Sequence, residues 1–315
     1  MCTGTLWSAR REQPLVTLDD LAERIRVALA LTMLAGCGRI RFDAVLDGGG
    51  DGSVACTSWT SWSVPQRISE LASPENDFGP ALAGDGRTVV FNRCDVDDSN
   101  CSLVIATWQD ATSTWSTPQL ISTLDTGAST QDGAWDAAGT RLYFGESTGN
   151  MLVSAYGGAA FGPGNIVAGL PNEAFAATLS SDELEMFYTL NMSMTQNLIA
   201  RATRTSIGDP WTDQGAVPEL ALSNDTGWPS LSSDGLTIYV EDDNDGPGPV
   251  QIYVATRTAI GGMFTPPMQV PELDASNAGN GDPEISRDGT TMLFSSDRAG
   301  GAGLADIYRA TRTCR

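Results

Sequence analysis

Short apolar segments recur along this chain at a nearly constant interval and predict a repeated all-β unit. Each segment follows a small acidic turn and is brief and rich in aromatic and branched residues, which is typical of a strand. The turns end at Gly86, Gly139, Gly235 and Gly289, and "SSDE" at 180–183 fills the same position between the second and third glycine. The spacings of 53, 44, 52 and 54 residues indicate a repeat architecture.

Each repeat contains four predicted strands, as a propeller blade requires. The stretch before the turn is the innermost strand, and the apolar segment after it is the second, as in "TVVF" at 88–91. A third strand follows a loop, as in "QIYVATR" and "DIYRATR". An aromatic residue then opens the fourth strand at Trp115, Phe161, Trp211 and Phe264. We expect the fourth-strand aromatics Trp62, Trp115, Trp211 and Phe264 to pack between blades rather than bind a ligand.

A repeated octapeptide predicts how the ring closes. "WSVPQRIS" at 62–69 nearly repeats "WSTPQLIS" at 115–122, which opens a fourth strand. The fifth repeat is followed by no fourth strand, so residues 62–69 would pair beside "DIYRATR" and leave no sheet edge open. We therefore expect a five-bladed β-propeller over residues 57–315. Six blades are the alternative, if the preceding residues contain further strands.

The composition restricts the possible functions more than it restricts the possible folds. The 39 acidic residues outnumber the 18 basic ones, all arginine, and the net charge of −21 repels nucleic acids and anionic membrane surfaces. The sequence has no histidine, which excludes Ser-His-Asp and Cys-His nucleophiles and histidine-ligated metals. Any chemistry would rest on carboxylates, hydroxyls or a hard cation such as calcium.

The repeat phrases resemble those of TolB-type (WD-like) propellers. The similar stretches are "PALAGDGRTVVF" at 80–91, "PSLSSDGLTIYVEDD" at 229–243 and "PEISRDGTTMLFSSDRAGGAGLADIYRATR" at 283–312. The resemblance covers about residues 58–313 and is weaker around Gly139 and Glu183. It implies a periplasmic or surface-facing binding scaffold.

The first 36 residues read as a signal peptide of the lipoprotein type. An apolar run at 27–36, behind Arg24 and Arg26, is too short to span a bilayer and ends in "LAGC", which resembles a lipobox with Cys37 as the lipidated residue. The alternative is a core helix that ends in cysteine by chance. Residues 37–56 then form a flexible tether, and we expect a lipid-anchored protein at a bacterial membrane, the outer membrane being favoured, facing the periplasm or cell surface.

Loop topology predicts one acidic face. The loops that enter each innermost strand, and those between second and third strands, emerge together on this face. Asp and Asn are common in turns because they bond nearby backbone, so each such residue is also explained by local structure. The predicted binding residues of this face are Asp77, Asp132, Glu173, Asp225 and Asp282, with Trp135 and Trp228 beside them.

Two loops of this face contain closely spaced carboxylates. "DVDDSN" and "EDDNDG" suggest calcium, with Asp95, Asp97, Asp243 and Asp245 as ligands, although neither loop has the full twelve-residue spacing of a calcium-binding hand. Calcium is therefore the one cofactor that the sequence suggests.

Two functions fit these features. The first, which we favour, is a non-catalytic, monomeric binding scaffold that holds a protein, peptide or glycan partner on the acidic face. The second is a glycoside hydrolase, since paired carboxylates cleave glycosides without histidine; its candidates are Asp77, Asp132, Asp225, Asp282 and Glu284.

Four cysteines remain in the predicted mature domain, and only one of their three pairings suits this topology. Cys94 ends a second strand and Cys101 begins the following third strand, so a bond between them would clip that hairpin. Cys314 follows the last third strand and Cys56 precedes the closing strand, where every other blade has a covalent loop. We therefore predict a Cys56–Cys314 disulfide.

Overall fold

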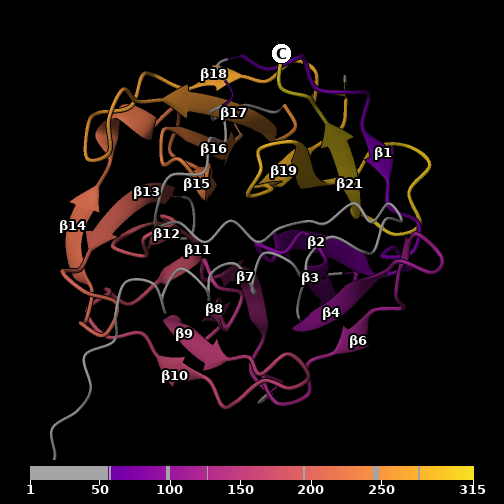
Figure 1. Cartoon of the computed structure of the whole chain (residues 1–315), viewed down its shortest axis with the longest axis horizontal. Helices are drawn as coiled ribbons and strands as arrows, with labels where there is room; N and C mark the ends of the chain where they lie inside the picture. Colours follow the sequence, from indigo (N-terminus) through magenta and orange to yellow (C-terminus); the bar gives the residue numbers. More distant parts are fainter. Residues whose placement is uncertain are drawn as a thin grey trace, which may run out of the picture. The chain divides into compact units, whose positions relative to one another are not determined.

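The structure is a computed structural model that describes residues 56, 58–96, 100–125, 127–193, 196–243, 248–275 and 277–315. This part of the chain folds into five antiparallel sheets, called blades I to V, each built on four strands. Figure 1 shows the blades around a centre, with β2, β7, β11, β15 and β19 innermost. The predicted signal peptide, Cys37 and the tether before Cys56 lie outside the described residues and stay predictions.

The strands of each blade are given from the centre outward. Blade I contains β2 (Asn76–Leu82), β3 (Thr88–Cys94), β4 (Cys101–Gln109) and β6 (Gln119–Leu120). Blade II contains β7 (Thr130–Trp135), β8 (Arg141–Glu146), β9 (Asn150–Ala155) and β10 (Asn165–Ile166). Blade III contains β11 (Ala174–Leu179), β12 (Glu185–Ser193), β13 (Gln196–Thr203) and β14 (Thr212–Ala216). Blade IV contains β15 (Thr226–Leu231), β16 (Thr237–Asp242), β17 (Gln251–Thr256) and β18 (Met268–Gln269). Blade V contains β19 (Asn280–Ile285), β20 (Thr291–Ser296), β21 (Asp306–Thr311) and β1 (Gln66–Arg67). A further short strand, β5 (Thr114–Trp115), pairs with the far end of β4, and η1 (Pro218–Leu220) is a single 3-10 turn.

The ring closes as the repeated octapeptide predicts. β1 comes first in the chain but pairs with β21, the third strand of the last blade, with Gln66 opposite Arg309. Backbone hydrogen bonds extend the pairing, from Ser63 N–H to Thr311 O at 2.8 Å and from Ile68 N–H to Ile307 O at 2.9 Å. The five-bladed prediction is therefore confirmed, and residues 62–69 complete blade V.

Both predicted disulfides are present. Cys94 lies opposite Cys101 in the β3–β4 pairing and is bonded to it. Cys56 is bonded to Cys314, and Trp59 forms a β-bridge with Cys314 just before the closing strand begins. The second disulfide therefore occupies the place of the covalent loop that joins third and fourth strands in the other blades.

Hydrophobic clusters fill each junction between neighbouring blades. The cluster between blades V and I shows the pattern, because Leu71 and Phe91 pack there against Leu293 and Ile307. Corresponding clusters lie between the other neighbours around the ring. The fourth-strand aromatics belong to these clusters and are buried, which confirms that they pack between blades: Trp62, Trp115, Phe161, Trp211 and Phe264.

The acidic turns between first and second strands are held by their own carboxylates. Asp234 accepts hydrogen bonds from the Ser232 hydroxyl at 2.6 Å and from Leu236 N–H at 2.9 Å. Asp288 makes the same pair of contacts with Ser286 and Thr290. These aspartates satisfy backbone donors, so the local explanation of acidic turns holds for them.

Candidate functional site: the acidic channel

Each innermost strand has a β-bulge at the same point, where the backbone takes a positive φ. The bulges bring one residue from every blade to the wall of a narrow channel between the five strands. Only the first is a glycine, so packing between the blades imposes a conformation that most side chains disfavour. These channel residues, in ring order, are Gly79, Asp132, Ala176, Trp228 and Asp282.

In four of the five blades, a side chain of the second strand accepts a hydrogen bond from the next bulge. Asn92 Oδ1 accepts from Asp132 N–H at 2.9 Å, and Thr189 Oγ1 accepts from Trp228 N–H at 2.8 Å. Glu241 Oε2 accepts from Asp282 N–H at 2.6 Å. Neutral oxygens of asparagine and threonine therefore serve in this position, and only in blade IV does a carboxylate take it.

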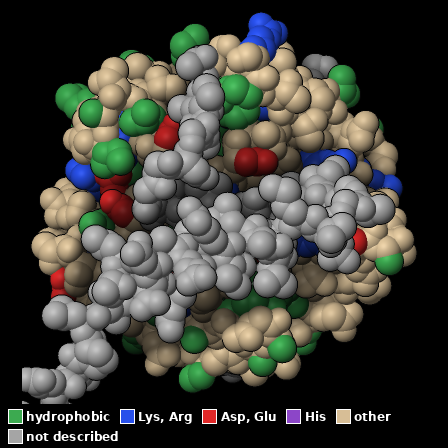
Figure 2. All heavy atoms as spheres, viewed as in Figure 1, with side chains coloured by type: hydrophobic (Ala, Val, Ile, Leu, Met, Phe, Trp, Pro, Cys, Tyr) green, Lys and Arg blue, Asp and Glu red, His purple; other side chains and the backbone are tan. Residues whose placement is uncertain are grey.

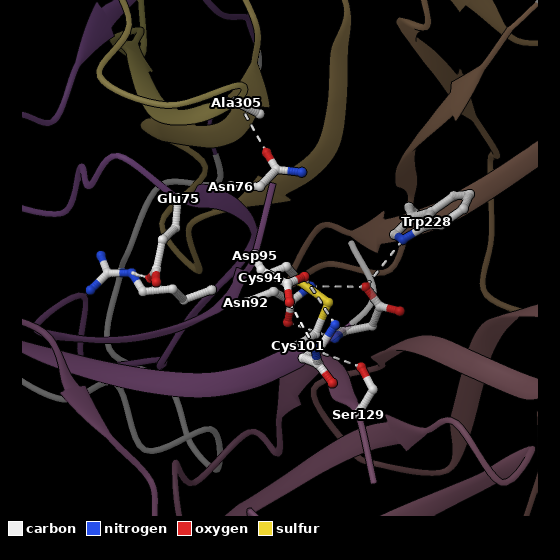
Figure 3. The surroundings of a disulfide bond; sticks show 12 residues. Glu75, Asn76, Asn92, Cys94, Asp95, Cys101, Ser129, Trp228 and Ala305 are labelled. Carbon is white, nitrogen blue, oxygen red and sulfur yellow. Dashed lines mark hydrogen bonds and ion pairs between the residues drawn. A yellow bond between two sulfur atoms is a disulfide. The ribbon is translucent and has the colours of Figure 1, made fainter. Parts of the chain in front are cut away.

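Asp132 lies at the centre of the site and is 4% exposed. Its Oδ1 accepts from Asn92 Nδ2 at 3.3 Å and from the indole Nε1 of Trp228 at 3.2 Å. Figure 3 labels Asn92 and Trp228, the two residues whose side chains donate to Asp132. Its Oδ2 is buried and has no hydrogen-bond partner in the structure. Asp132 thus presents an unsatisfied acceptor to the channel that it lines.

Three further carboxylates lie in or next to the wall of the channel. Burial, and then the nearby charge of Asp282, raise the pKa of Asp132 to about 7. Burial raises the pKa of Asp282 to about 6, although the Ser295 hydroxyl donates to it. Burial, followed by the charge of Asp282, raises the pKa of Glu241 well above its usual value. Glu284, one step further along the channel, has a pKa raised by burial to about 7.

No arginine neutralises these four side chains within the described part of the chain, because its ion pairs all involve other acids. Their hydrogen-bond donors are neutral, for example Leu82 N–H to Glu284 Oε1 at 3.1 Å. Asp132, Glu241 and Asp282 therefore repel one another in a buried environment. The cavity beside Asp132, Trp228 and Asp282 has a volume of about 30 Å³.

Hydrogen bonds between turns ring the other end of the channel. Ser181 Oγ donates to Ser233 O at 2.6 Å, and Ser233 Oγ donates to Arg287 O at 2.7 Å. Arg287 Nη1 then donates to Ala137 O at 2.7 Å. The cavity at this end measures about 90 Å³ and has Glu284 in its wall.

The structure brings together only part of the predicted acidic face. Asp132, Asp282 and Trp228 converge in the channel, as described above. Asp77 is fully buried within blade I, where it pairs with Arg93 at 2.7 Å and accepts from Ser73 N–H. Trp135 is 9% exposed, and its indole N–H donates to Ala81 O at the junction with blade I.

Two predicted residues lie at the entrances of inner strands. Glu173 is exposed and has a positive φ just before β11. Asp225 is half-buried just before β15 and accepts from Asn197 Nδ2 at 2.6 Å. Neither of them lines the cavity beside Asp132.

The suggested calcium loops are only partly described. Asp95 closes its hairpin by accepting from Asn100 N–H at 3.1 Å, and Asp243 accepts from Ser223 Oγ at 3.3 Å. Asp97 and Asp245 lie outside the described residues. In the segments that are described, no three acidic or cysteine side chains form a group that could hold a metal ion. Calcium binding by these loops therefore stays a prediction.

Glu241 is the channel residue that sequence reasoning missed, because it stands inside an apolar second strand. Aligning the five repeats at their bulges would have revealed it. The equivalent residues in the other blades are Asn92, Gly145, Thr189 and Ser295, so a glutamate here departs from its own repeat.

Figure 2 shows hydrophobic side chains scattered around the rim of the face that it presents. Among the described residues, no helix is long and apolar enough to cross a membrane.

No protein-family model and no curated protein matches this sequence. Solved structures share its fold: a GH62 α-L-arabinofuranosidase domain from Coprinopsis cinerea is similar over 81% of this chain and 96% of its own, with a TM-score of 0.53 and 11% identity. A family 117 glycoside hydrolase from Zobellia galactanivorans is similar over 80% and 90%, with a TM-score of 0.52 and 12% identity. TolB from Acinetobacter baumannii gives a TM-score of 0.43 and 14% identity over 78% of this chain, which spans 56% of that protein. At these identities the likeness shows the fold alone.

Proposed function

We propose that this chain is a non-catalytic binding scaffold whose acidic channel receives a positively charged part of a protein or peptide partner. The observation that carries the proposal is the convergence of Asp132, Glu241, Asp282 and Glu284 without an arginine partner. Buried carboxylates are costly unless a cation or a proton compensates them. A cationic ligand therefore gains affinity from charges that the free protein holds at a cost.

Cavity size favours binding over glycoside cleavage. Pockets that enclose small molecules usually measure about 300 Å³ or more. The cavities at the two levels of this channel measure about 30 and 90 Å³. A sugar ring does not fit between the carboxylates at that size, whereas the end of one side chain does.

A pull-down from detergent-solubilised envelope, with the full chain as bait, tests this proposal. We expect specific partners to be retained by the wild type and lost when Asp132 and Asp282 are both replaced by Asn. The matched control is Asp110→Asn, which removes one exposed charge paired with Arg87 at the surface. Equal retention by the channel variant and the wild type would contradict the proposal.

Glycoside hydrolysis is the second candidate, favoured by one observation. Asp132 and Glu284 have pKa values of about 7, which suits a general acid near neutral pH. This reading predicts release of nitrophenol from a nitrophenyl arabinofuranoside and loss of that release in Glu284→Gln. Absence of turnover by the wild type would leave the binding proposal alone.

We also propose the cellular setting that the sequence suggests, a bacterial envelope protein anchored by lipid on Cys37. Support comes from the "LAGC" motif after the apolar run at 27–36. Fatty-acid labelling of the full chain tests it, because Cys37→Ser should abolish the label.

A further inference from the structure

The cavity beside Asp132 lies among the bulges of the inner strands, with Asp132 and Asp282 in its wall. Trp228 crosses from blade IV toward Asp132 on blade II, and the small side chain of Ala176 occupies the blade between them. On the other side, Gly79 stands between Asp132 and Asp282 in the ring. A Cβ on Gly79 would collide with Asn92 Nδ2, so the glycine leaves room for the asparagine that donates to Asp132. The cavity is therefore a gap with carboxylates of two blades in its wall.

The wall of this gap is rich in acceptors and poor in donors. Pro80, Pro229 and Pro283 follow the bulge in three of the five blades and have no N–H group. The indole N–H of Trp228 already donates to Asp132 Oδ1. Oδ2 of the same carboxylate is buried and has no hydrogen-bond partner. A ligand that satisfies this wall must bring hydrogen-bond donors and positive charge.

Size then distinguishes between cations. A cavity of about 30 Å³ holds roughly two waters, since each needs about 10–15 Å³. A primary ammonium is a compact charge with three donors, whereas a guanidinium is a wider planar fork with five. The gap therefore suits an ammonium at the end of an unbranched chain.

We propose that the gap lined by Gly79, Asp132 and Asp282 is a binding site for a primary ammonium group, held by Asp132 Oδ2 and the carboxylate of Asp282 and supplied by a lysine side chain of the partner. This inference rests on the proposed function and names the chemistry of its ligand. Glu241, which accepts a hydrogen bond from Asp282 N–H, adds negative charge behind the site. The chain itself contains no lysine, so none of its own side chains supplies a competing ammonium.

The test is thermal melting of the full chain at pH 8, at constant ionic strength and in an amine-free buffer. The probes are n-butylammonium, n-butylguanidinium, tetramethylammonium and calcium, each as the chloride. A ligand of the native state raises Tm by mass action. We expect n-butylammonium to raise Tm saturably, by about 2–5 °C, and the other three cations to leave it unchanged.

Variants locate the effect. Asp132→Asn and Asp282→Asn should each weaken n-butylammonium binding by about tenfold or more, the size expected for a charge-assisted hydrogen bond. Asp110→Asn should bind as the wild type does. A short acetylated peptide with one lysine should bind at least as tightly as the free amine, and its arginine counterpart should not bind.

Three outcomes would overturn the ammonium site: no shift with n-butylammonium, equal shifts with all the organic cations, or a saturable shift with calcium alone. These failures differ from failure of the proposed function. If n-butylammonium has no effect but the channel variant still loses its envelope partners, the scaffold stands without the ammonium site. If the amine binds and the variant keeps every partner, the scaffold proposal fails instead.

Discussion

At the residue scale, each channel carboxylate occupies a position where other blades have a neutral side chain or none. Asp282 corresponds to Gly79 and Ala176, and Glu241 corresponds to Thr189 and Ser295. The fold therefore tolerates neutral residues at these points and does not need the charges for stability. Buried carboxylates at positions where neutral residues would serve are typical of functional sites.

The first prediction concerns Asp132. Its pKa is about 7 in the native state and about 3.8 in the unfolded chain, so the unfolded state ionises first as pH rises. Through this group, the free energy of unfolding of the wild type should therefore fall between about pH 4 and pH 7 and stay constant above pH 7. Asn does not titrate, so Asp132→Asn should gain stability over the wild type across that range, reaching about 1–4 kcal/mol at pH 8.

Denaturant unfolding of both proteins from pH 4 to pH 8, in an amine-free buffer, measures this difference. Asp110→Asn is the control, and its difference from the wild type should not grow with pH. A constant or shrinking advantage of Asp132→Asn would show that the carboxyl titrates normally in the native state.

At the element scale, one position repeats after every third strand. Arg204, Arg257 and Arg312 each donate Nε–H to a carbonyl of the acidic turn, at 2.7 Å, and stack on a fourth-strand or neighbouring aromatic ring. In blades I and II, Trp108 and Tyr156 take this position and pack on Trp115 and Phe161. In blades III to V, this arginine thus joins the acidic turn, the end of the third strand and an aromatic ring.

Arg257 provides the second prediction. It is 5% exposed, forms two hydrogen bonds with Glu185 on blade III and stacks over Phe264. Arg257→Ala removes one of the two arginines beside Glu185, while Arg201 stays at 2.7 Å, and should lower the free energy of unfolding by about 1.5–3 kcal/mol. Arg309→Ala, at an exposed position on β21, should change it by less than about 1 kcal/mol. Similar losses in both variants, measured by urea unfolding, would contradict a special role for this position.

The sequence predicted the blades well because strand, turn and repeat period are local properties. "SSDG" at 232–235 forms its turn with hydrogen bonds among neighbouring residues, so its position is readable without the fold. The channel was harder to predict because its contacts join blades: Asn92 and Asp132 are 40 residues apart, and Trp228 and Asp132 are 96 apart. The burial of Asp77 likewise goes with its ion pair to Arg93 of β3, which strand periodicity does not reveal.

At the scale of the whole molecule, closure of the ring depends on a strand taken from the start of the domain. β1 contributes only Gln66 and Arg67 to regular pairing, yet Ile68 and Leu71 beside it belong to the cluster between blades V and I. The Cys56–Cys314 bond holds this segment in place across a sequence separation of 258 residues. The Cys94–Cys101 bond, with a separation of 7, constrains a single hairpin.

The third prediction compares these two bonds. In the chain-entropy model, a loop of this length contributes on the order of 5 kcal/mol and the hairpin about 2–3 kcal/mol. Replacing Cys56 and Cys314 by Ser should therefore lower stability more than replacing Cys94 and Cys101. Urea unfolding of both double variants under oxidising conditions measures the two losses, and a greater loss from the hairpin variant would contradict this order.

The closure also decides how the propeller carries a mechanical load. A pull on the chain from the N-terminal side of Cys56 passes at once into Cys314 through the disulfide, and also along residues 58–65 into β1. The two routes enter neighbouring strands, β1 and β21, which are joined further by the bridge between Trp59 and Cys314. Tension is therefore shared by both strands, and β1 does not separate from blade V one hydrogen bond at a time. A propeller held at this point keeps its ring closed under load.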